Sequence, residues 1–237
     1  MSDEIRLGEI VEGWTVPPRP DAPVLEGRFA RLELLNADAH AAEIHRANSV
    51  DDGIWDFLGY GPYTSAAGYH RWVRDMTATD DPVFYAIKNL ESGHFEGVAS
   101  FLRISPEAGS IEVGHINFAK PLQRTRAATE AMFLMMQWAY EAGYRRYEWK
   151  CNALNMGSRR SAERLGFSYE GIFRQAGIAK GRNRNTAWYA SIDREWPALK
   201  SAFSTWLAPQ NFEADGQQKE SLSDLTRLVR VVDDPAL

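Results

Sequence analysis

The chain has 237 residues, a formal net charge of −5, 44% hydrophobic residues and 25% charged residues. This length fits one well-buried domain with short appendages, and the balance is ordinary for a soluble globular protein. The acidic total argues against nucleic acid as the main ligand, and no apolar run approaches the ~20 residues that span a bilayer. The single cysteine, Cys151, cannot form an internal disulfide, which together with an N-terminus lacking an apolar core segment predicts a cytoplasmic protein.

The first half of the chain combines proline-rich, helical and alternating segments. Proline has no backbone N–H donor and therefore resists helix formation. Apolar residues spaced three to four positions apart predict a helix, and alternation of apolar and polar residues predicts a strand. In chain order we expect an extended arm (1–26), a strand (28–35), a helix (38–49), an aromatic loop or short helix (54–63), a helix capped by Thr64 or Ser65 and ending near 77, and strands at 83–88, 97–104 and 110–118.

The second half alternates helices and strands. We expect a helix (127–142), a strand (147–152), a helix (155–165), a strand (167–175), a polar turn (182–185), a strand (186–193), a helix (195–207), a linker (210–216) and a terminal helix (221–231). Hairpins followed by strand–helix–strand crossovers imply a mixed sheet with helices on both faces. We therefore predict one α/β (α+β) domain over 27–208, an N-terminal arm over 1–26, and a C-terminal linker and helical tail over 209–237.

The segment from Gln123 to Thr129 joins a strand to the long helix. The first amides of a helix lack internal partners and lie at the positive end of its dipole, so such a start favours phosphate. Arg124 and Arg126 add positive charge beside it. The alternative for this segment alone is a capped helix start with solvated arginines.

Three motifs in order carry a family resemblance. The turn Gln123-x-x-Arg126-x-Ala128 is followed by Asn152-x-x-Asn155-x-x-Ser158 with a later Leu-Gly-Phe, and then by the strand Glu-Gly-Ile-Phe-Arg starting at Glu170. Together they resemble the GNAT superfamily of N-acetyltransferases, in its ribosomal-protein (RimJ/RimL-type) branch. The resemblance covers about residues 28–193.

The resemblance implies a GNAT fold, whose mixed, mostly antiparallel sheet is splayed between its fourth and fifth strands. The splay, near Asn117-Phe118 and Lys150–Asn152, is expected to receive the pantetheine arm of acetyl-coenzyme A, with no metal ion. The expected coenzyme-binding residues are Asn117, Phe118, Gln123, Arg124, Thr125, Arg126, Ala127, Ala128, Thr129, Asn152, Asn155 and Ser158. Asn152 and Asn155 have a simpler alternative as turn-forming asparagines.

Two residues are the expected catalytic groups. Ser158, at the position where relatives place a serine near the coenzyme sulfur, is the candidate general acid, with helix capping as its alternative role. Glu112 is the first candidate for the base that deprotonates the attacking amine, and His115 is the second. Strand alternation places Glu112 and His115 on opposite faces unless a bulge intervenes. A tyrosine acid used by other branches is excluded, because its position holds Ala162.

One departure from the family pattern concerns Arg126, which replaces a glycine that lets the backbone approach the pyrophosphate. If Arg126 has a negative φ at the helix start, its amide remains available and its side chain is free to turn outward; an inward side chain would block the site.

The predicted function is transfer of acetyl from acetyl-coenzyme A to a primary amine, of a small molecule or a protein N-terminus, by direct attack in a ternary complex. The second hypothesis is a non-catalytic acyl-coenzyme A sensor or interaction protein. The aromatic residues Trp55, Phe57, Tyr60 and Tyr63 are predicted as core or lid packing, with an acceptor-pocket wall as the alternative. The tail is compatible with dimerisation into a homodimer, with covering the acceptor site, or with packing on the domain. No nucleic acid or membrane partner is expected.

Overall fold

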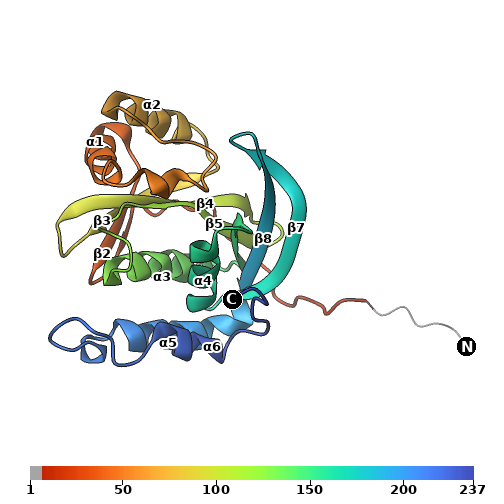
Figure 1. The fold of residues 1–237 in the computed structure, drawn as a ribbon. Coiled ribbons are helices and arrows are strands. Elements are labelled where there is room, and N and C mark those ends of the chain that lie inside the picture. Colours follow the sequence, from red (N-terminus) through yellow and green to blue (C-terminus); the bar gives the residue numbers. More distant parts are fainter. Residues whose placement is uncertain (1–6) are drawn as a thin grey trace, which may run out of the picture.

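A computed structural model describes residues 7–237; residues 1–6 of the predicted arm lie outside this range. The protein is built on one eight-stranded sheet in the order β1-β2-β3-β4-β5-β6-β8-β7 (Figure 1). The strands are β1 (Val24–Glu26), β2 (Ala30–Leu34), β3 (Val83–Asn89), β4 (His94–Ser105), β5 (Ser110–Phe118), β6 (Arg146–Asn152), β7 (Ser168–Ala179) and β8 (Arg182–Ile192). Neighbouring strands are antiparallel except β5 and β6, which are parallel.

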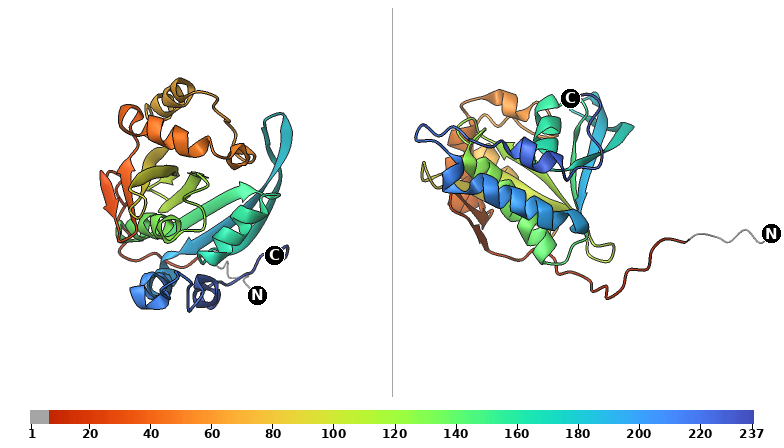
Figure 2. Two further views of the ribbon diagram at one scale, coloured as in Figure 1. Left: turned by 60° about the vertical axis from the view of Figure 1, so that its left-hand side comes forward. Right: turned by 90° about the horizontal axis from the view of Figure 1, so that it is seen from below.

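Helices cover both faces of this sheet (Figures 1 and 2). The upper face, as Figure 1 is drawn, carries α1 (Ala37–Asn48) and α2 (Ala66–Met76), and the lower face carries α3 (Arg126–Glu141), α4 (Met156–Arg164), α5 (Trp196–Leu207) and α6 (Leu222–Arg227). Short 3-10 turns lie at Asp52–Trp55, Asp193–Glu195 and Pro209–Asn211. The predicted mixed, mostly antiparallel fold with helices on both faces is confirmed. Within residues 7–237, none of the helices has the length and apolar character that a bilayer crossing requires.

Two hydrophobic clusters, one on each face, position the strands. The lower cluster packs alternate residues of β5 and β6, including Ile111, Val113 and Trp149, against α3 residues such as Met135. The upper cluster packs Val98 of β4 against α1 and α2. Because side chains alternate along a strand, every second residue of β5 and β6 is left for the upper face.

Side-chain caps explain where the helices begin. Ser65 accepts a hydrogen bond from the Gly68 amide at the start of α2, which confirms the predicted cap. Thr125 caps α3 through the Ala128 amide, and Asn155 caps α4 through the Ser158 amide.

The structure corrects two element predictions. β1 forms within the predicted extended arm, because Val24–Glu26 pair with the edge of β2. The predicted polar turn at 182–185 is wrong, because these residues begin β8. The hairpin instead turns at Lys180 and Gly181, whose φ angles of 49° and 72° form a tight two-residue connection.

The chain after α5 returns along α4 and β7. The Tyr169 amide of β7 donates to the carbonyl of Val232, and Arg230 donates to the carbonyl of Glu163 on α4. The division into an arm, a domain over 27–208 and a tail stays a prediction. The tail contacts both β7 and α4, and its residue Asp234 binds Arg159 of α4.

Candidate coenzyme and acceptor site

The sheet opens between β5 and β6. The two strands pair from Ser110 opposite Arg146 to Val113 opposite Trp149, and beyond that point Gly114–Phe118 and Lys150–Asn152 are not paired with each other. Because β1 was not predicted, β5 and β6 correspond to the fourth and fifth predicted strands, and the predicted splay between them is confirmed. Backbone groups of β5 that face the opening are available to a ligand that binds as an added strand would.

A β-bulge at His115 changes which side chains of β5 lie on the upper face of the sheet at the opening. Glu112, Gly114 and Asn117 pair with Leu102, Ser100 and Val98 of β4, so β5 uses three residues where β4 uses two. His115, within the bulge, has a φ of 50°. The bulge considered as the exception to strand alternation is therefore present, and Glu112, His115 and Asn117 all lie on the upper face.

Glu112 is a buried carboxylate held by two cations. Its side chain is 3% exposed, its Oε1 lies 2.6 Å from a guanidinium nitrogen of Arg103, and its Oε2 lies 2.9 Å from Nζ of Lys150. Lys150 also contacts Glu148 at 2.7 Å, so its charge is shared between two carboxylates. Burial raises the pKa of Glu112 above its ordinary value, although Lys150 and Arg103 oppose the shift. This carboxyl group takes up a proton more readily than a solvated glutamate.

His115 lies beside an aromatic wall on the same face. Its Nδ1 is 3.0 Å from the hydroxyl of Tyr60, and its ring contacts the rings of Tyr60 and Phe84. Burial lowers the pKa of His115 to about 4, and the charges of Arg103 and Arg184 contribute. The imidazole is therefore neutral at physiological pH and a weak proton acceptor.

The aromatic residues of the 54–63 segment divide between packing and exposure. Trp55 is buried and contacts Tyr60, Tyr63 and Tyr69 edge-on, which matches the core or lid packing predicted for the cluster. Tyr60, through His115, is the member that reaches the opening, whereas Phe57 is 38% exposed.

The turn before α3 is the segment that the sequence predicts to bind phosphate. Arg124 has a φ of 62°. Arg126 is the first residue of α3, and its φ is not positive. The left-handed conformation thus falls two residues before the position where relatives carry glycine, so Arg126 is tolerated. Its amide and that of Ala127 belong to the first turn, where helical amides lack internal acceptors. Gln123 fixes the turn by donating from Nε2 to the carbonyl of Phe118 at 2.9 Å.

The side chain of Arg126 is turned away from this amide cluster. Its guanidinium lies over the rings of Phe29 and Phe212, at 4.6 and 5.1 Å from their centroids, and 3.6 Å from Glu91. These partners belong to the start of β2, the C-terminal segment and the β3–β4 turn. The outward arrangement holds, and the inward, blocking arrangement is not found.

The α4 start places Ser158 on the lower side of the opening. Asn152 accepts from the Leu154 amide and Asn155 from the Ser158 amide, so both asparagines make the local turn bonds considered for them. Capping by Asn155 shows that Ser158 is not the helix cap, which corrects that alternative. The Ser158 hydroxyl instead accepts a hydrogen bond from Nε1 of Trp149 at 3.0 Å.

Asn117 is a buried polar side chain at the opening. It is 1% exposed, and neither its Oδ1 nor its Nδ2 has a hydrogen-bond partner among the described residues. A buried amide without partners costs free energy, so the position fits a polar group of a ligand. The opening therefore combines an unpartnered buried amide, the unpaired edge of β5 and, at the start of α3, amides without helical acceptors.

A C-terminal residue stabilises the α4 start from below. Arg159, next to Ser158, makes a two-pronged ion pair with the buried carboxylate of Asp234 and donates to the carbonyl of Ala153 at 2.9 Å. Tyr189 of β8 also donates to Asp234. Burial alone would raise the pKa of Asp234, but the bonds from Arg159 and Tyr189 hold it below its ordinary value.

The cationic partners of Glu112 and the buried pair of Arg159 and Asp234 were not predicted from the sequence. Arg103 reaches Glu112 from a strand position with a φ of 47°, and Asp234 reaches Arg159 from 75 residues away. Only Lys150 could have been found from the sequence. Glu148 and Lys150 are two residues apart and so share one face of β6, and Glu148 lies opposite Glu112 in the parallel pairing of β5 and β6. Within residues 7–237, no group of His, Cys, Asp or Glu side chains is arranged to hold a metal ion.

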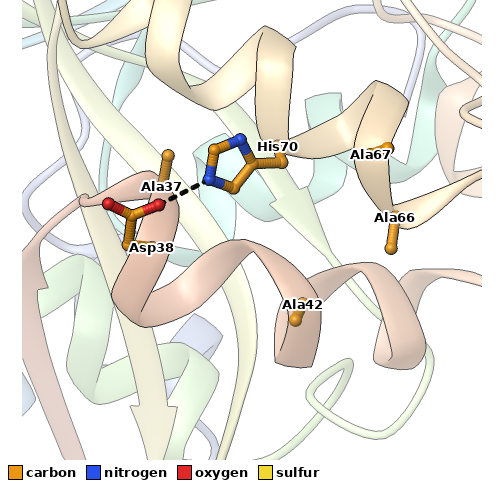
Figure 3. Close-up of a pocket in the computed structure, with 6 residues that line it drawn as sticks. All are labelled: Ala37, Asp38, Ala42, Ala66, Ala67 and His70. Atoms are coloured by element: carbon orange, nitrogen blue, oxygen red, sulfur yellow. Dashed lines mark hydrogen bonds and ion pairs between the residues drawn. The ribbon is translucent and has the colours of Figure 1, made fainter.

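Two surface depressions are present on the described part of the chain. One, of about 270 Å³, lies between α1 and α2 and is lined largely by alanines; Asp38 and His70 face each other across it at 2.7 Å (Figure 3). The other, of about 420 Å³, is lined by residues of the arm and of the α2–β3 connection, such as Arg19 and Pro82. Neither contains a residue predicted for the site.

Comparison with known proteins agrees with this geometry. A sequence profile of the acetyltransferase (GNAT) domain matches residues 31–168. The structure resembles that of a GCN5-related N-acetyltransferase from Brucella melitensis, with 44% identity, a TM-score of 0.89, and coverage of 92% of this chain and 100% of the other. A probable GNAT-family acetyltransferase from Chromobacterium violaceum is 35% identical, with a TM-score of 0.78 and coverage of 82% and 98%. The chain therefore belongs to the GNAT acetyltransferase family.

A more distant neighbour bears on the branch. The ribosomal-protein acetyltransferase RimL, solved with coenzyme A, is 21% identical, with a TM-score of 0.62 and coverage of 72% of this chain and 98% of RimL. At this identity the likeness shows a shared fold, and the RimJ/RimL branch stays a prediction. No protein of curated function matches the chain.

Proposed function

We propose that this protein transfers an acetyl group from acetyl-coenzyme A to a primary amine of a small molecule or of a protein N-terminus. The observation that carries the proposal is the opening between β5 and β6, with Glu112 and His115 on its upper face and Ser158 on its lower side. Acetyl transfer needs a proton acceptor at the amine and a proton donor at the thiol, on opposite sides of the reacting carbonyl.

The coenzyme side of the opening fits the chemical groups of the substrate. Asn117, Phe118, Asn152 and Asn155 border the splay, where pantetheine amides would bind beside the unpaired edge of β5. The turn from Gln123 to Thr129 would hold the pyrophosphate through the free amides of α3. The structure of RimL with coenzyme A supports this class of ligand for the fold.

The reaction we propose is direct attack in a ternary complex. The amine arrives as an ammonium ion and gives a proton to Glu112, whose raised pKa suits it to this role better than the weakly basic His115. The amine nitrogen then forms a bond to the acetyl carbon while the carbon–sulfur bond breaks. The hydroxyl of Ser158 donates a hydrogen bond to the departing sulfur and passes to it the second proton that the nitrogen loses, so the products are the acetylated amine and the free thiol, and Glu112 releases the first proton to solvent.

Coenzyme binding and thiol release test the proposal. Coenzyme A at millimolar concentration should raise the melting temperature, because a ligand of the native state stabilises it, and an amine panel should release free thiol from acetyl-coenzyme A. Replacing Ser158 by alanine should lower kcat by roughly 10²-fold. The matched control is Ser161→Ala on the same helix, whose hydroxyl donates to the carbonyl of Gly157 and should not matter for turnover.

The second candidate is a non-catalytic acyl-coenzyme A sensor on the same fold. Arg126 in place of the loop glycine motivates it, although the outward side chain weakens that motive. A melting-temperature rise with coenzyme but no thiol release from any amine would favour the sensor. For the acetyltransferase we also propose a cytoplasmic location, which the single cysteine supports, and assembly into a homodimer.

A further inference from the structure

The hairpin of β7 and β8 carries positive charges that have no acidic partner. Lys180, Arg182 and Arg184 make no ion pair within 4 Å among residues 7–237, and Arg184 donates instead to the Thr186 hydroxyl at 3.3 Å. In a chain with a net charge of −5, a local excess of cations is notable because unpaired positive charge attracts anions.

Two of these cations lie on the face where the acceptor amine would enter. Trp188 opposes Lys150 in the β6–β8 register, and Nζ of Lys150 lies 3.7 Å from the Trp188 ring centroid, which places Trp188 on the upper face. The register shifts of the hairpin insert extra residues into β7, so β8 alternates regularly and Arg182 and Arg184 share the face of Trp188.

The third cation connects the hairpin to the opposite wall. The hairpin rises on the side of the sheet that α1 and α2 cover (Figures 1 and 2), and Nζ of Lys180 donates to the carbonyl of Trp55 at 2.8 Å. The hairpin and the aromatic segment therefore meet above the sheet, and Arg184 is near enough to His115 for its charge to disfavour a protonated imidazole.

The carboxylates of β5 and β6 on this face are paired with cations. Glu112 is paired with Arg103 and Lys150, and Glu148 with Arg146 and Lys150. Asp81 accepts two backbone amides, those of Arg103 and Ile104. Because Glu112 and Glu148 already have cationic partners, they do not cancel the positive charge that Arg182 and Arg184 bring to the upper face beside the opening.

We propose that the acceptor is an anionic amine, with a carboxylate or phosphate near the reacting nitrogen that binds Arg184 and Arg182. The inference rests on the proposed function, because it assigns the substrate class of that same site. Arginine suits such recognition, since its planar guanidinium binds both oxygens of a carboxylate or phosphate. The anionic group has two sources, a small amino acid-like amine or the acidic N-terminus of a peptide.

The experiment compares matched acceptors. One pair is an ω-amino acid and its carboxamide; the other is a short peptide with Asp at its second and third positions and the same peptide with Asn. The value measured is kcat/KM for each acceptor, at low salt and with 0.5 M NaCl. The wild-type protein should favour the anionic member of at least one pair by about tenfold, and added salt should reduce the preference through screening.

Variants of the hairpin test whether the arginines cause the preference. Arg184→Gln should reduce the anionic-to-neutral ratio about threefold, through KM, and Arg182→Gln with Arg184→Gln should bring it close to one. Arg227→Gln on α6 removes the same charge from an exposed position on the lower face and should leave the ratio unchanged. Melting temperatures within a few degrees of wild type would confirm folded variants.

Each outcome decides the inference. Preference in the small-amine pair, in the peptide pair or in both supports it and identifies the source. Transfer without preference for the anionic member, or a preference that survives the double substitution, overturns it and leaves the proposed function intact. Absence of transfer to any amine overturns both.

Discussion

Two buried carboxylates, Glu112 at the opening and Asp234 in the C-terminal segment, contrast in how their charge is satisfied. Both are less than 5% exposed and both contact arginine. Asp234 shares Arg159 with no other carboxylate and also accepts hydrogen bonds from Tyr189 and the Ala236 amide, and its pKa lies below its ordinary value. Glu112 shares Lys150 with Glu148, its Arg103 partner is largely exposed, and burial raises its pKa.

The difference distinguishes a structural carboxylate from a candidate catalytic one. A fully hydrogen-bonded carboxylate stays ionised and connects chain segments, as Asp234 does between α4 and β8. A buried carboxylate with shared partners is easier to protonate, and such tuned groups concentrate at active sites. Each prediction below changes one side of this contrast.

The largest expected effect is on turnover. Glu112→Gln keeps the shape of the side chain but removes the proton acceptor, so kcat/KM should fall by about 10² to 10⁴-fold with coenzyme binding retained. Steady-state kinetics and a coenzyme titration measure this. Glu148→Gln, which disturbs the same lysine, is the matched control and should lose far less activity. Equal losses in both variants would show that the lysine network, rather than a base at position 112, matters.

Asp234→Asn should act on stability. It leaves Arg159 buried without its counter-charge, which typically costs about 3–5 kcal/mol in the free energy of unfolding. Urea denaturation measures the change, with Asp75→Asn, whose partner Arg74 is equally exposed, as control at below about 1 kcal/mol. Because the pKa of Asp234 is lowered, its contribution is present above the unfolded pKa and is lost as pH falls, so the variant should differ less from wild type in acid. An unchanged midpoint at neutral pH would contradict the structural role.

His115 should make stability depend on pH in a defined window. Its pKa of about 4 lies below the ordinary 6.5, so the unfolded chain takes up a proton first as pH falls. Stability is therefore fully present above pH 6.5 and declines towards pH 4, by up to about 3 kcal/mol. His115→Gln should flatten this part of the curve of unfolding free energy against pH. The same slope in wild type and variant would place the titration elsewhere.

The smallest expected effect concerns Arg126. Since its guanidinium lies between Phe29 and Phe212, Arg126→Ala should lower stability by about 0.5–1 kcal/mol through lost cation–π contacts. The dissociation constant of coenzyme A, from calorimetric titration, should change by less than about threefold. A much larger weakening would mean that the side chain leaves these rings to bind the coenzyme.

Apart from β1, the sequence alone determined the order and approximate ends of the helices and strands, from Ser110–Phe118 of β5 to the α3 start at Arg126, because periodicity, caps and turn residues are local signals. It also identified the splay and the family through its three motifs. It misplaced the hairpin turn, because Lys180-Gly181 has weaker turn chemistry than the asparagine-rich stretch after it.

Tertiary structure decided what surrounds each predicted residue. Whether His115 joins Glu112 depends on a bulge, which pairing with β4 creates and no local pattern records. The partners Arg103 for Glu112 and Asp234 for Arg159 arise from folding that joins distant segments. Local interactions select the elements, whereas the charge and protonation of a site depend on groups that only the packed chain brings within a few ångströms.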